Sequence, residues 1–397
     1  MIPIAQPLLG PEEARAASQA VLSGWLSQGP QVAAFEAEFA DLVGVEHACA
    51  VSNCTTALHL ALLAVGVGPG DEVVTVSHSF IASANAIRQC GGVPIFVDIE
   101  ENGFNIDPTS IEAAITERTR AILCVHQIGM PCDLAAIRAI ASAHRLPVIE
   151  DAACAIGSEI FIDGAWSKIG RPQGDIVCFS FHPRKVITTG EGGMLTTRNP
   201  AYDSKFRLWR QHGMSVSDVQ RHRSTSVVFE TYPVQGFNYR MTDIQAAVGR
   251  EQIKRLGGIV ARRRAIADQY AALLQHVEGV EAPKEVPWAR SNWQSYCVRL
   301  DPGIDQPALM QRMLEKGVAT RRGIMCIHME EAHADLPRRH PLPRSEYARD
   351  HCILLPLFTQ MTREMQDEVV ATLVEAVASS GRSRPGRKVP AKMVVAS

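Results

Sequence analysis

Short apolar runs alternate with helix-sized connections between residues 48 and 181, and this alternation narrows the possible folds more than any other feature. Strands buried on both faces are apolar throughout, and parallel strands need a long crossover, usually a helix. The pattern therefore predicts an α/β fold with a large, doubly wound, mostly parallel sheet. The expected strands are Ala48–Val51, Glu72–Val76, Val93–Val97, Ala121–Val125, Val148–Asp151 and Ile176–Phe181.

The length of 397 residues favours two domains, because single cores stop growing at about 250 to 300 residues. Two helices, beginning near Pro11 and near Val32, precede the sheet. A long helical stretch from Met241 to about Val277, with a possible break at Gly257-Gly258, leads towards a second unit. That unit contains a strand, Ser295–Leu300, and helices.

We therefore expect an N-terminal arm and large domain over residues 1–255 and a smaller C-terminal α/β domain over 256–378. Residues 379–397 are rich in Arg, Lys, Ser, Pro and Gly. Such a segment cannot bury much surface, so a disordered basic tail is expected there.

Charge and composition exclude several classes of partner. Forty Lys and Arg balance 42 Asp and Glu, so nothing favours nucleic acid or an anionic membrane as the main partner. No signal peptide and no apolar run of membrane-spanning length is seen, which predicts a cytoplasmic protein. The ten cysteines form no C-x-x-C pair, and His328 and His333 have the wrong spacing for H-E-x-x-H, so no metal site is expected.

One lysine stands in a setting that favours covalent chemistry. The segment Ser180-Phe-His-Pro-Arg-Lys185 ends a strand and enters a turn, and the glycine-rich stretch Gly190–Gly193 follows. Lysine forms Schiff bases, and burial is expected to lower its pKa and make it a nucleophile. An isolated lysine here would be read as a surface residue, but the segments described next favour a site.

Two other segments place polar groups at the same edge of the predicted sheet. Glu150 and Asp151 end an apolar strand, and ligands of open α/β sheets bind at such strand ends. Either carboxylate could keep a cofactor ring nitrogen protonated, or Asp151 could simply cap the next helix. Residues 52–56 lie between a strand and a helix, where free N–H groups and the helix dipole favour an anion such as phosphate.

With these segments in place, the chain resembles the DegT/StrS family of sugar aminotransferases, which are fold-type I enzymes dependent on pyridoxal 5′-phosphate (PLP). The resemblance extends from Ile2 to about Val377. The matching segments include Gly24–Pro30, Gly70–Val73, Val125-His126, Gly129–Asp133, Glu150–Ala153, Ser180–Lys185, Gly190–Gly193, Gly236–Met241 and Leu354–Leu357.

The resemblance implies a role for each of several residues. Lys185 would carry PLP as a Schiff base and move protons, Asp151 would pair with the pyridine nitrogen, and Phe80 would stack on the ring. Lys185 and Asp151 are therefore the expected catalytic residues.

The remaining implied contacts concern the cofactor's phosphate. The backbone amides of Thr55 and Thr56 would bind it together with the Ser180 hydroxyl. Asn238 would reach the phosphate of a neighbouring subunit's cofactor, which implies a homodimer with shared active sites.

Some positions depart from the family pattern. Cys54 stands where the family usually has Gly, and Cys154 stands near the expected phenolic oxygen of the cofactor, where His or Gln is common. The segment from Arg321 to His328 also differs from the usual sugar-facing loop. Arg321 and Arg322 could pair with a diphosphate or be solvated, so the acceptor stays open.

The resemblance predicts ping-pong transfer of an amino group from an amino acid, expected to be glutamate, to a keto-sugar that is expected to be nucleotide-linked. One alternative is a PLP-dependent deoxysugar dehydratase, in which His replaces the lysine, and Lys185 argues against it. The other alternative is a non-catalytic sensor or regulatory protein that uses the same fold.

Overall fold

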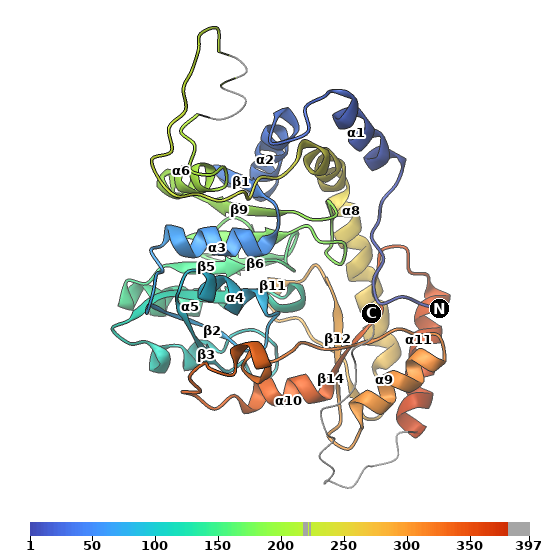
Figure 1. The fold of residues 1–397 in the computed structure, drawn as a ribbon. Helices are drawn as coiled ribbons and strands as arrows, with labels where there is room; N and C mark the ends of the chain where they lie inside the picture. The colour runs from blue at the N-terminus through green and yellow to red at the C-terminus, as the bar shows by residue number, and fades with distance from the viewer. Residues whose placement is uncertain (217–220, 222–223, 380–397) are drawn as a thin grey trace.

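The computed structural model describes residues 1–216, 221 and 224–379, and its central feature is a large α/β sheet (Figure 1). Within these residues the sheet has seven strands in the order β1-β9-β8-β5-β4-β2-β3. The strand β9 is antiparallel to both neighbours, and the other paired strands are parallel. The strands are β1 (His47–Val51), β2 (Glu72–Val76), β3 (Val93–Val97), β4 (Thr119–Val125), β5 (Val148–Asp151), β8 (Ile176–Ser180) and β9 (Gly193–Thr197).

The predicted fold class is confirmed, with one addition in the sheet. All expected strands are present, and the glycine-rich stretch after Lys185 leads into a further strand, β9, which was not among them. Gly193 pairs with Val51 on one side and with Ser180 on the other. A Cβ at Gly193 would lie only 2.5 Å from the carbonyl oxygen of Asn53. Glycine is required here because β9 passes close to the main chain at the start of the next helix.

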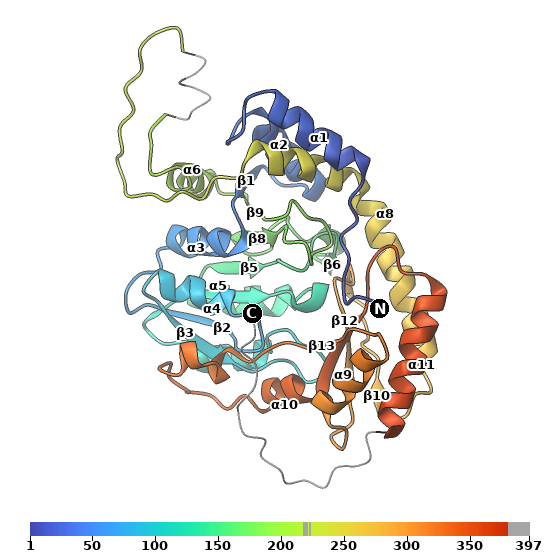
Figure 2. The ribbon, with the colours of Figure 1, turned by 45° about the vertical axis from the view of Figure 1, so that its right-hand side comes forward.

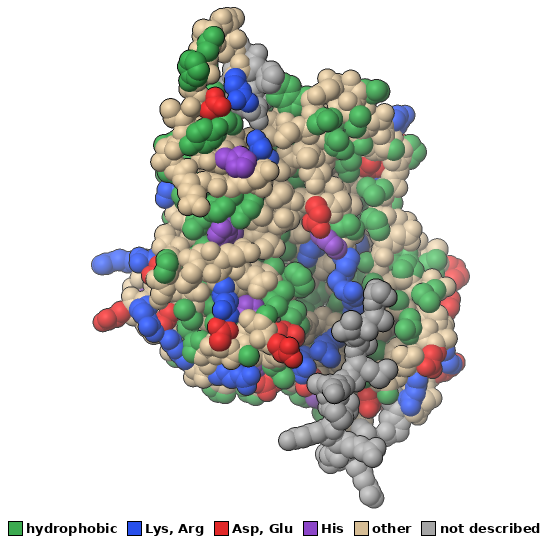
Figure 3. Space-filling model, in the orientation of Figure 1, with side chains coloured by type: hydrophobic (Ala, Val, Ile, Leu, Met, Phe, Trp, Pro, Cys, Tyr) green, Lys and Arg blue, Asp and Glu red, His purple; other side chains and the backbone are tan. Residues whose placement is uncertain are grey.

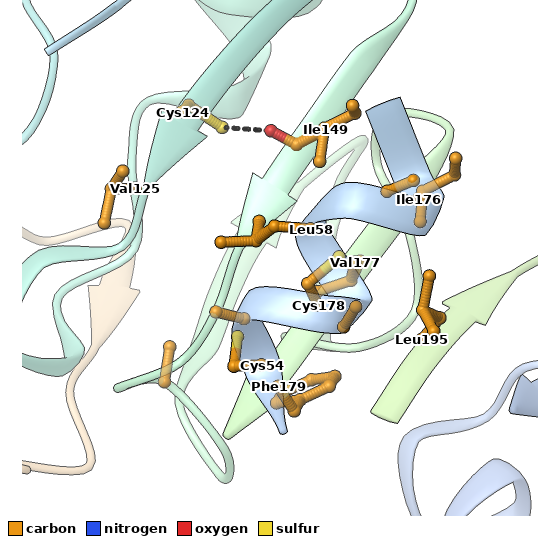
Figure 4. Packing of buried hydrophobic residues seen from close by; sticks show 14 of the residues in the cluster. Cys54, Leu58, Cys124, Val125, Ile149, Ile176, Val177, Cys178, Phe179 and Leu195 are labelled. Carbon is orange, nitrogen blue, oxygen red and sulfur yellow. Dashed lines mark hydrogen bonds between the residues drawn. The ribbon is translucent and has the colours of Figure 1, made fainter. Parts of the chain in front are cut away.

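Helices cover both faces of the large sheet. On one face α3 packs against β8 and β9, and on the other α2 packs against β1 and α8 (Figures 1 and 2). Figure 4 shows Cys54 and Leu58 of α3 close to Cys178 on β8. The ring of Phe179 lies on the opposite face, 5.1 Å from that of Phe39. The helices of this region are α1 (Pro11–Leu22), α2 (Pro30–Val43), α3 (Cys54–Ala64), α4 (Ala82–Gln89), α5 (Leu134–His144) and α6 (Pro200–Trp209).

The helix α8 (Asp243–Leu274) contributes to two hydrophobic clusters. Its N-terminal part, up to Val260, packs into the cluster around the large sheet, and its C-terminal part, from Ile266 onwards, packs into the other. The possible break at Gly257-Gly258 is absent, since α8 is one unbroken helix of 32 residues. A side chain at either glycine would face open space. The domain limit predicted after residue 255 therefore falls inside a continuous helix. The predicted bounds of the two domains stay a prediction.

The second cluster is built on an antiparallel sheet in the order β10-β12-β14-β13. Ile2 also packs in this cluster and bridges to Val318, whereas Ile4 packs against the cluster around the large sheet. The elements here are β10 (Val280–Glu281), β12 (Tyr296–Leu300), α9 (Gln306–Glu315), β13 (Arg321–Arg322), α10 (Pro343–His351), β14 (Cys352–Leu355) and α11 (Arg363–Ser379).

A small sheet in the order β11-β6-β7 lies beside the large one. Its strands are β6 (Glu159–Ile162), β7 (Ala165–Lys168) and β11 (Ala289–Arg290). The described residues also form short 3₁₀ helices: η1 (Pro108–Ser110), η2 (Glu112–Ala114), η3 (Gln127–Gly129), η4 (Ile327–Met329) and η5 (Glu331–His333).

The expected basic tail, residues 379–397, lies outside the described residues except for Ser379. None of the described helices combines the length and apolar character needed to cross a bilayer.

Candidate active site

The predicted site residues gather where β5 and β8 end and where α3 begins. Asp151, the last residue of β5, pairs with Cys178 on β8. Ser180 ends β8, two residues further along. Cys54 is the first residue of α3, and the charge of Asp151 influences its titration. Strand register and helix position thus bring three distant parts of the sequence together.

Asp151 is a buried carboxylate with few partners. It is 5% exposed, and its oxygens accept hydrogen bonds from the Ser83 hydroxyl (3.0 Å) and from the Ala153 N–H (3.1 Å). Burial raises the pKa of Asp151, and these bonds and the nearby Lys185 only partly oppose it. A cationic group beside this carboxylate would lower that pKa and stabilise the charged form.

The neighbouring carboxylate, Glu150, points to the other face of the sheet and is fully bonded. It accepts the N–H groups of Gln173 and Gly174, both at 2.9 Å. Its second oxygen lies 3.2 Å from Nε2 of His126. Glu150 therefore holds the main chain that leads into β8. Of the two carboxylates, Asp151 is the one that can contact a ligand at this edge of the sheet.

Lys185 lies beside Cys154 rather than beside a carboxylate. A turn positions it, in which the Lys185 N–H donates to the His182 carbonyl at 2.8 Å. Its Nζ donates to Sγ of Cys154 at 3.1 Å. Burial lowers the pKa of Lys185, but the neighbouring groups, led by Cys154, outweigh burial and raise it above the usual value. The expectation of a lowered lysine pKa is therefore wrong for this arrangement.

Of the two amides expected to bind phosphate at the start of α3, one is available for an anion. Asn53 caps the helix, because its side chain accepts the N–H of Thr56 at 2.9 Å. The Thr56 amide, expected to bind phosphate, is thus already bonded within the cap. The Thr55 amide has no hydrogen-bond partner among the described residues. Ser180 lies close by, because Gly193 pairs with it and also contacts the start of α3.

Phe80 stands on the loop after β2, and the residue is 69% exposed. Ser83, three residues later, donates to Asp151 and so ties this loop to the end of β5. The sequence analysis missed Ser83, since a serine next to a helix start carries no motif. Its position three residues after the expected stacking aromatic was the one available signal.

Two further residues that the sequence analysis missed connect the second unit to the site. Asn292 donates to the Cys154 carbonyl at 2.8 Å. Gln294 donates to the Arg184 carbonyl, also at 2.8 Å. Both precede β12, so the smaller sheet holds the main chain on each side of the Lys185–Cys154 contact.

Asn238 is not joined to this cluster within one chain. Its side chain is exposed, its Oδ1 accepts from Nε of Arg240 at 3.3 Å, and its backbone bridges to Gln211. The role expected for Asn238, contact with a second subunit's cofactor, is not tested by a single chain.

The family model for the DegT/DnrJ/EryC1/StrS aminotransferases matches residues 7–374. The chain belongs to this family. It is 37% identical over 388 residues to the spore coat polysaccharide biosynthesis protein SpsC of Bacillus subtilis (strain 168), covering 95% of this chain and 97% of SpsC. The fold is similar to that of the aminotransferase TlmJ from Streptoalloteichus hindustanus, with a TM-score of 0.87, 32% identity and coverage of 96% and 99%. DesV of S. venezuelae matches with a TM-score of 0.85, 31% identity and the same coverage.

These findings confirm the predicted family, fold class, enzyme class and PLP cofactor. They also support the coarse prediction of a sugar aminotransferase. The amino donor, the acceptor and its nucleotide, the ping-pong order, the dimer and the cytoplasmic location stay predictions.

Proposed function

We propose that this aminotransferase transfers an amino group from an amino acid, with glutamate as the expected donor, to a keto-sugar that is expected to be nucleotide-linked. The transfer would proceed as two half-reactions at one site. The observation that carries the proposal is the cluster of Lys185, Cys154 and Asp151 at the ends of β5 and β8.

The residues of the cluster fit PLP. The buried carboxylate of Asp151, whose pKa is raised by burial, suits a protonated ring nitrogen. The Thr55 amide and the Ser180 hydroxyl suit a phosphate, and the exposed ring of Phe80 suits stacking. When bound, PLP supplies an aldehyde for the amine and a ring that withdraws electrons from the reacting carbon.

The chain's own groups would then act as follows. Nζ of Lys185 would hold the aldehyde covalently and, once released by the incoming amine, would move a proton to and from the reacting carbon. Asp151 would keep the ring nitrogen protonated. Sγ of Cys154, 3.1 Å from Nζ, would orient the lysine and face the phenolic oxygen of the ring.

Trapping with borohydride tests the assignment of Lys185. The wild type should show the visible absorption band of lysine-bound PLP, and reduction should fix the cofactor to Lys185. Lys185→Ala should lose the band. Lys168 and Lys205 are matched controls, because their Nζ groups donate to the carbonyls of Leu42 and Ala64. Cofactor fixed to either of them would refute the assignment.

The acceptor requires a substrate panel. Enzyme that has taken up an amino group should be offered nucleotide-linked keto-sugars and, in parallel, cyclitol ketones. Return of the visible band identifies the ketones that accept the amino group. Failure of every amino acid to discharge the band in the first step would favour the non-catalytic alternative. Loss of a hydroxyl from the sugar without amine transfer would favour the dehydratase.

We also propose a homodimer in which Asn238 of each chain contacts the cofactor phosphate of the other. Exposed apolar side chains on the segment after α6, including Val227 (83%) and Phe229 (86%), support contact with a second copy. This segment stands out from the body of the molecule (Figures 1 and 2).

Mixed dimers test the shared site. Asn238→Asp would place a carboxylate beside the phosphate and weaken cofactor binding, whereas Lys185→Ala removes the covalent attachment. When the two inactive variants are unfolded and refolded together, random pairing makes about half of the dimers hybrid, and each hybrid has one intact site. About a quarter of all sites should therefore be active. Verified hybrids that stay inactive would mean that each site belongs to one chain.

A further inference from the structure

The adjacent arginines Arg321 and Arg322 on β13 face opposite sides of the smaller sheet. Arg321 is level with Leu354, which belongs to the cluster around the large sheet. Arg322 is level with Ile353, which belongs to the second cluster. Residues paired across antiparallel strands share a face, and successive residues alternate. The two arginines therefore cannot bind one diphosphate together.

Two further observations show which side of the smaller sheet each arginine occupies. Arg322 lines a cavity of about 490 Å³ with Met310 and Leu314 of α9, away from the large sheet. A Cβ at Gly323, which shares its face with Arg321, would contact Sγ of Cys297 in the large-sheet cluster. Arg321 therefore lies on the side of β13 that faces the active site.

A second arginine, Arg184, lies within electrostatic range of Arg321. It immediately precedes Lys185, and its carbonyl accepts from Gln294, two residues before β12. The start of β12 is level with the end of β14 that pairs with Arg321. Arg184 is half-buried, and burial followed by the charge of Arg321 lowers its pKa. Cys154, the partner of Lys185, acts on the pKa of Arg184 in the opposite direction, so Arg184 lies within electrostatic range of both Arg321 and Cys154.

This pair of cations has no counterion in the described part of the chain. Neither Arg184 nor Arg321 forms an ion pair with a described carboxylate. By contrast, Arg207 and Arg210 are both paired with Glu36. Arg184 is half-buried and Arg321 is exposed at the edge of β13. Their like charges repel each other, and a bound anion would reverse that cost. Figure 3 shows Lys and Arg side chains beside a hollow near the middle of the face that it draws.

We propose that Arg184 and Arg321 form an oxyanion-binding subsite next to Lys185 for an anionic group of a substrate. The inference rests on the proposed function. Guanidinium groups bind carboxylates and phosphates through paired N–H donors. The anion is a carboxylate of the amino donor or a phosphate of a nucleotide-linked acceptor. The two sources share this chemistry and are separated by the probes below.

Binding of two probes to the PLP-loaded enzyme tests the subsite. Glutarate represents a dicarboxylate donor without its amine, and inorganic pyrophosphate represents the acceptor's diphosphate. Dissociation constants come from calorimetry on the wild type, Arg184→Met, Arg321→Met and the matched control Arg322→Met. Each of the first two variants should weaken the preferred probe by about 10- to 100-fold. Arg322→Met should bind like the wild type, and Arg184→Lys should recover only part of the affinity.

The outcomes separate the sources and the hypotheses. Tight glutarate binding assigns the subsite to the donor, and tight pyrophosphate binding assigns it to the acceptor. The inference is overturned if neither probe binds the wild type, if Arg322→Met weakens binding as much, or if the Arg184 or Arg321 variant loses PLP. The proposed function is measured separately, as discharge of the visible band by amino acids. A wild type that transfers amino groups with unaltered probe binding in the variants would defeat the subsite alone.

Discussion

Replacing Asp151 by Asn should stabilise the PLP-free protein while it disables the enzyme. The side chains are nearly the same size, and the amide can still accept the Ala153 N–H and bond to the Ser83 hydroxyl. The variant therefore removes a buried negative charge and little else. The pKa of Asp151 is raised by burial, so its ionised form destabilises the folded state at neutral pH.

The sign of the effect follows from linkage. A raised carboxyl pKa means that the contribution of Asp151 to stability is present below its unfolded pKa and is lost as the pH rises through the folded pKa. Near pH 4 the wild type and the variant should therefore unfold at similar temperatures. Above the folded pKa the variant should be more stable by about 1 to 3 kcal/mol, the typical cost of a buried polar group without its full set of partners.

Thermal unfolding of PLP-free protein, followed by circular dichroism between pH 4 and 8, measures this gap. Bound PLP should protect the wild type more than the variant, because Asp151 gains a cationic partner. The half-reaction with an amino donor should slow by about 10²- to 10⁴-fold in the variant. Glu150→Gln is the control: it disturbs two main-chain bonds and should destabilise the fold at neutral pH. A less stable PLP-free Asp151→Asn protein, a gap without pH dependence, or near-normal rates would refute the reasoning.

Two further predictions concern the frame around the site. Burial raises the pKa of Glu36, but Arg210 and Arg207 outweigh burial and lower it. Glu36→Gln should therefore cost about 3 to 5 kcal/mol in denaturant unfolding at neutral pH, and the loss should shrink as the pH falls through the folded pKa. An equal loss at pH 3 and pH 7 would contradict this. Gly193→Ala should cost about 1 to 3 kcal/mol and weaken PLP binding, because its Cβ would meet main chain, whereas Gly257→Ala, which faces open space, should be neutral or slightly stabilising. Equal stability of the two alanine variants would count against the close approach.

The parts of the fold that sequence reasoning found are those with a local signal. The strand Val148–Asp151 was predicted with its observed limits, because a strand buried on both faces has to be apolar throughout. The strand β9 was missed, because its glycine is required by a neighbouring helix start that lies about 140 residues earlier in the chain. The hairpin β6–β7 was missed for a related reason: it pairs with Ala289-Arg290, and no local pattern marks such distant pairing.

The same distinction separates what was predicted of the site from what was not. The positions of Lys185 and Asp151 could be inferred from the segments that carry them. The charge state of Lys185 could not, because it depends on Cys154, which lies beside Nζ only after β5 and β8 have paired. The sequence analysis considered Arg321 and Arg322 together as possible partners of one diphosphate. Neighbouring residues can be assigned to opposite faces only when the strand that carries them is known.

Polar contacts between the two units hold the proposed anion subsite in place. The start of α10 is capped from the large sheet, where the buried Asp98 accepts the N–H groups of Arg344 (2.9 Å) and Ser345 (2.8 Å). His328, in the turn after β13, lies 2.6 Å from the Ser77 hydroxyl at the end of β2. The helix α10 leads into β14, which carries β13. Arg321 is therefore positioned by contacts to the same parallel sheet whose other strands present Asp151 and Lys185, so both sides of the site depend on one rigid element.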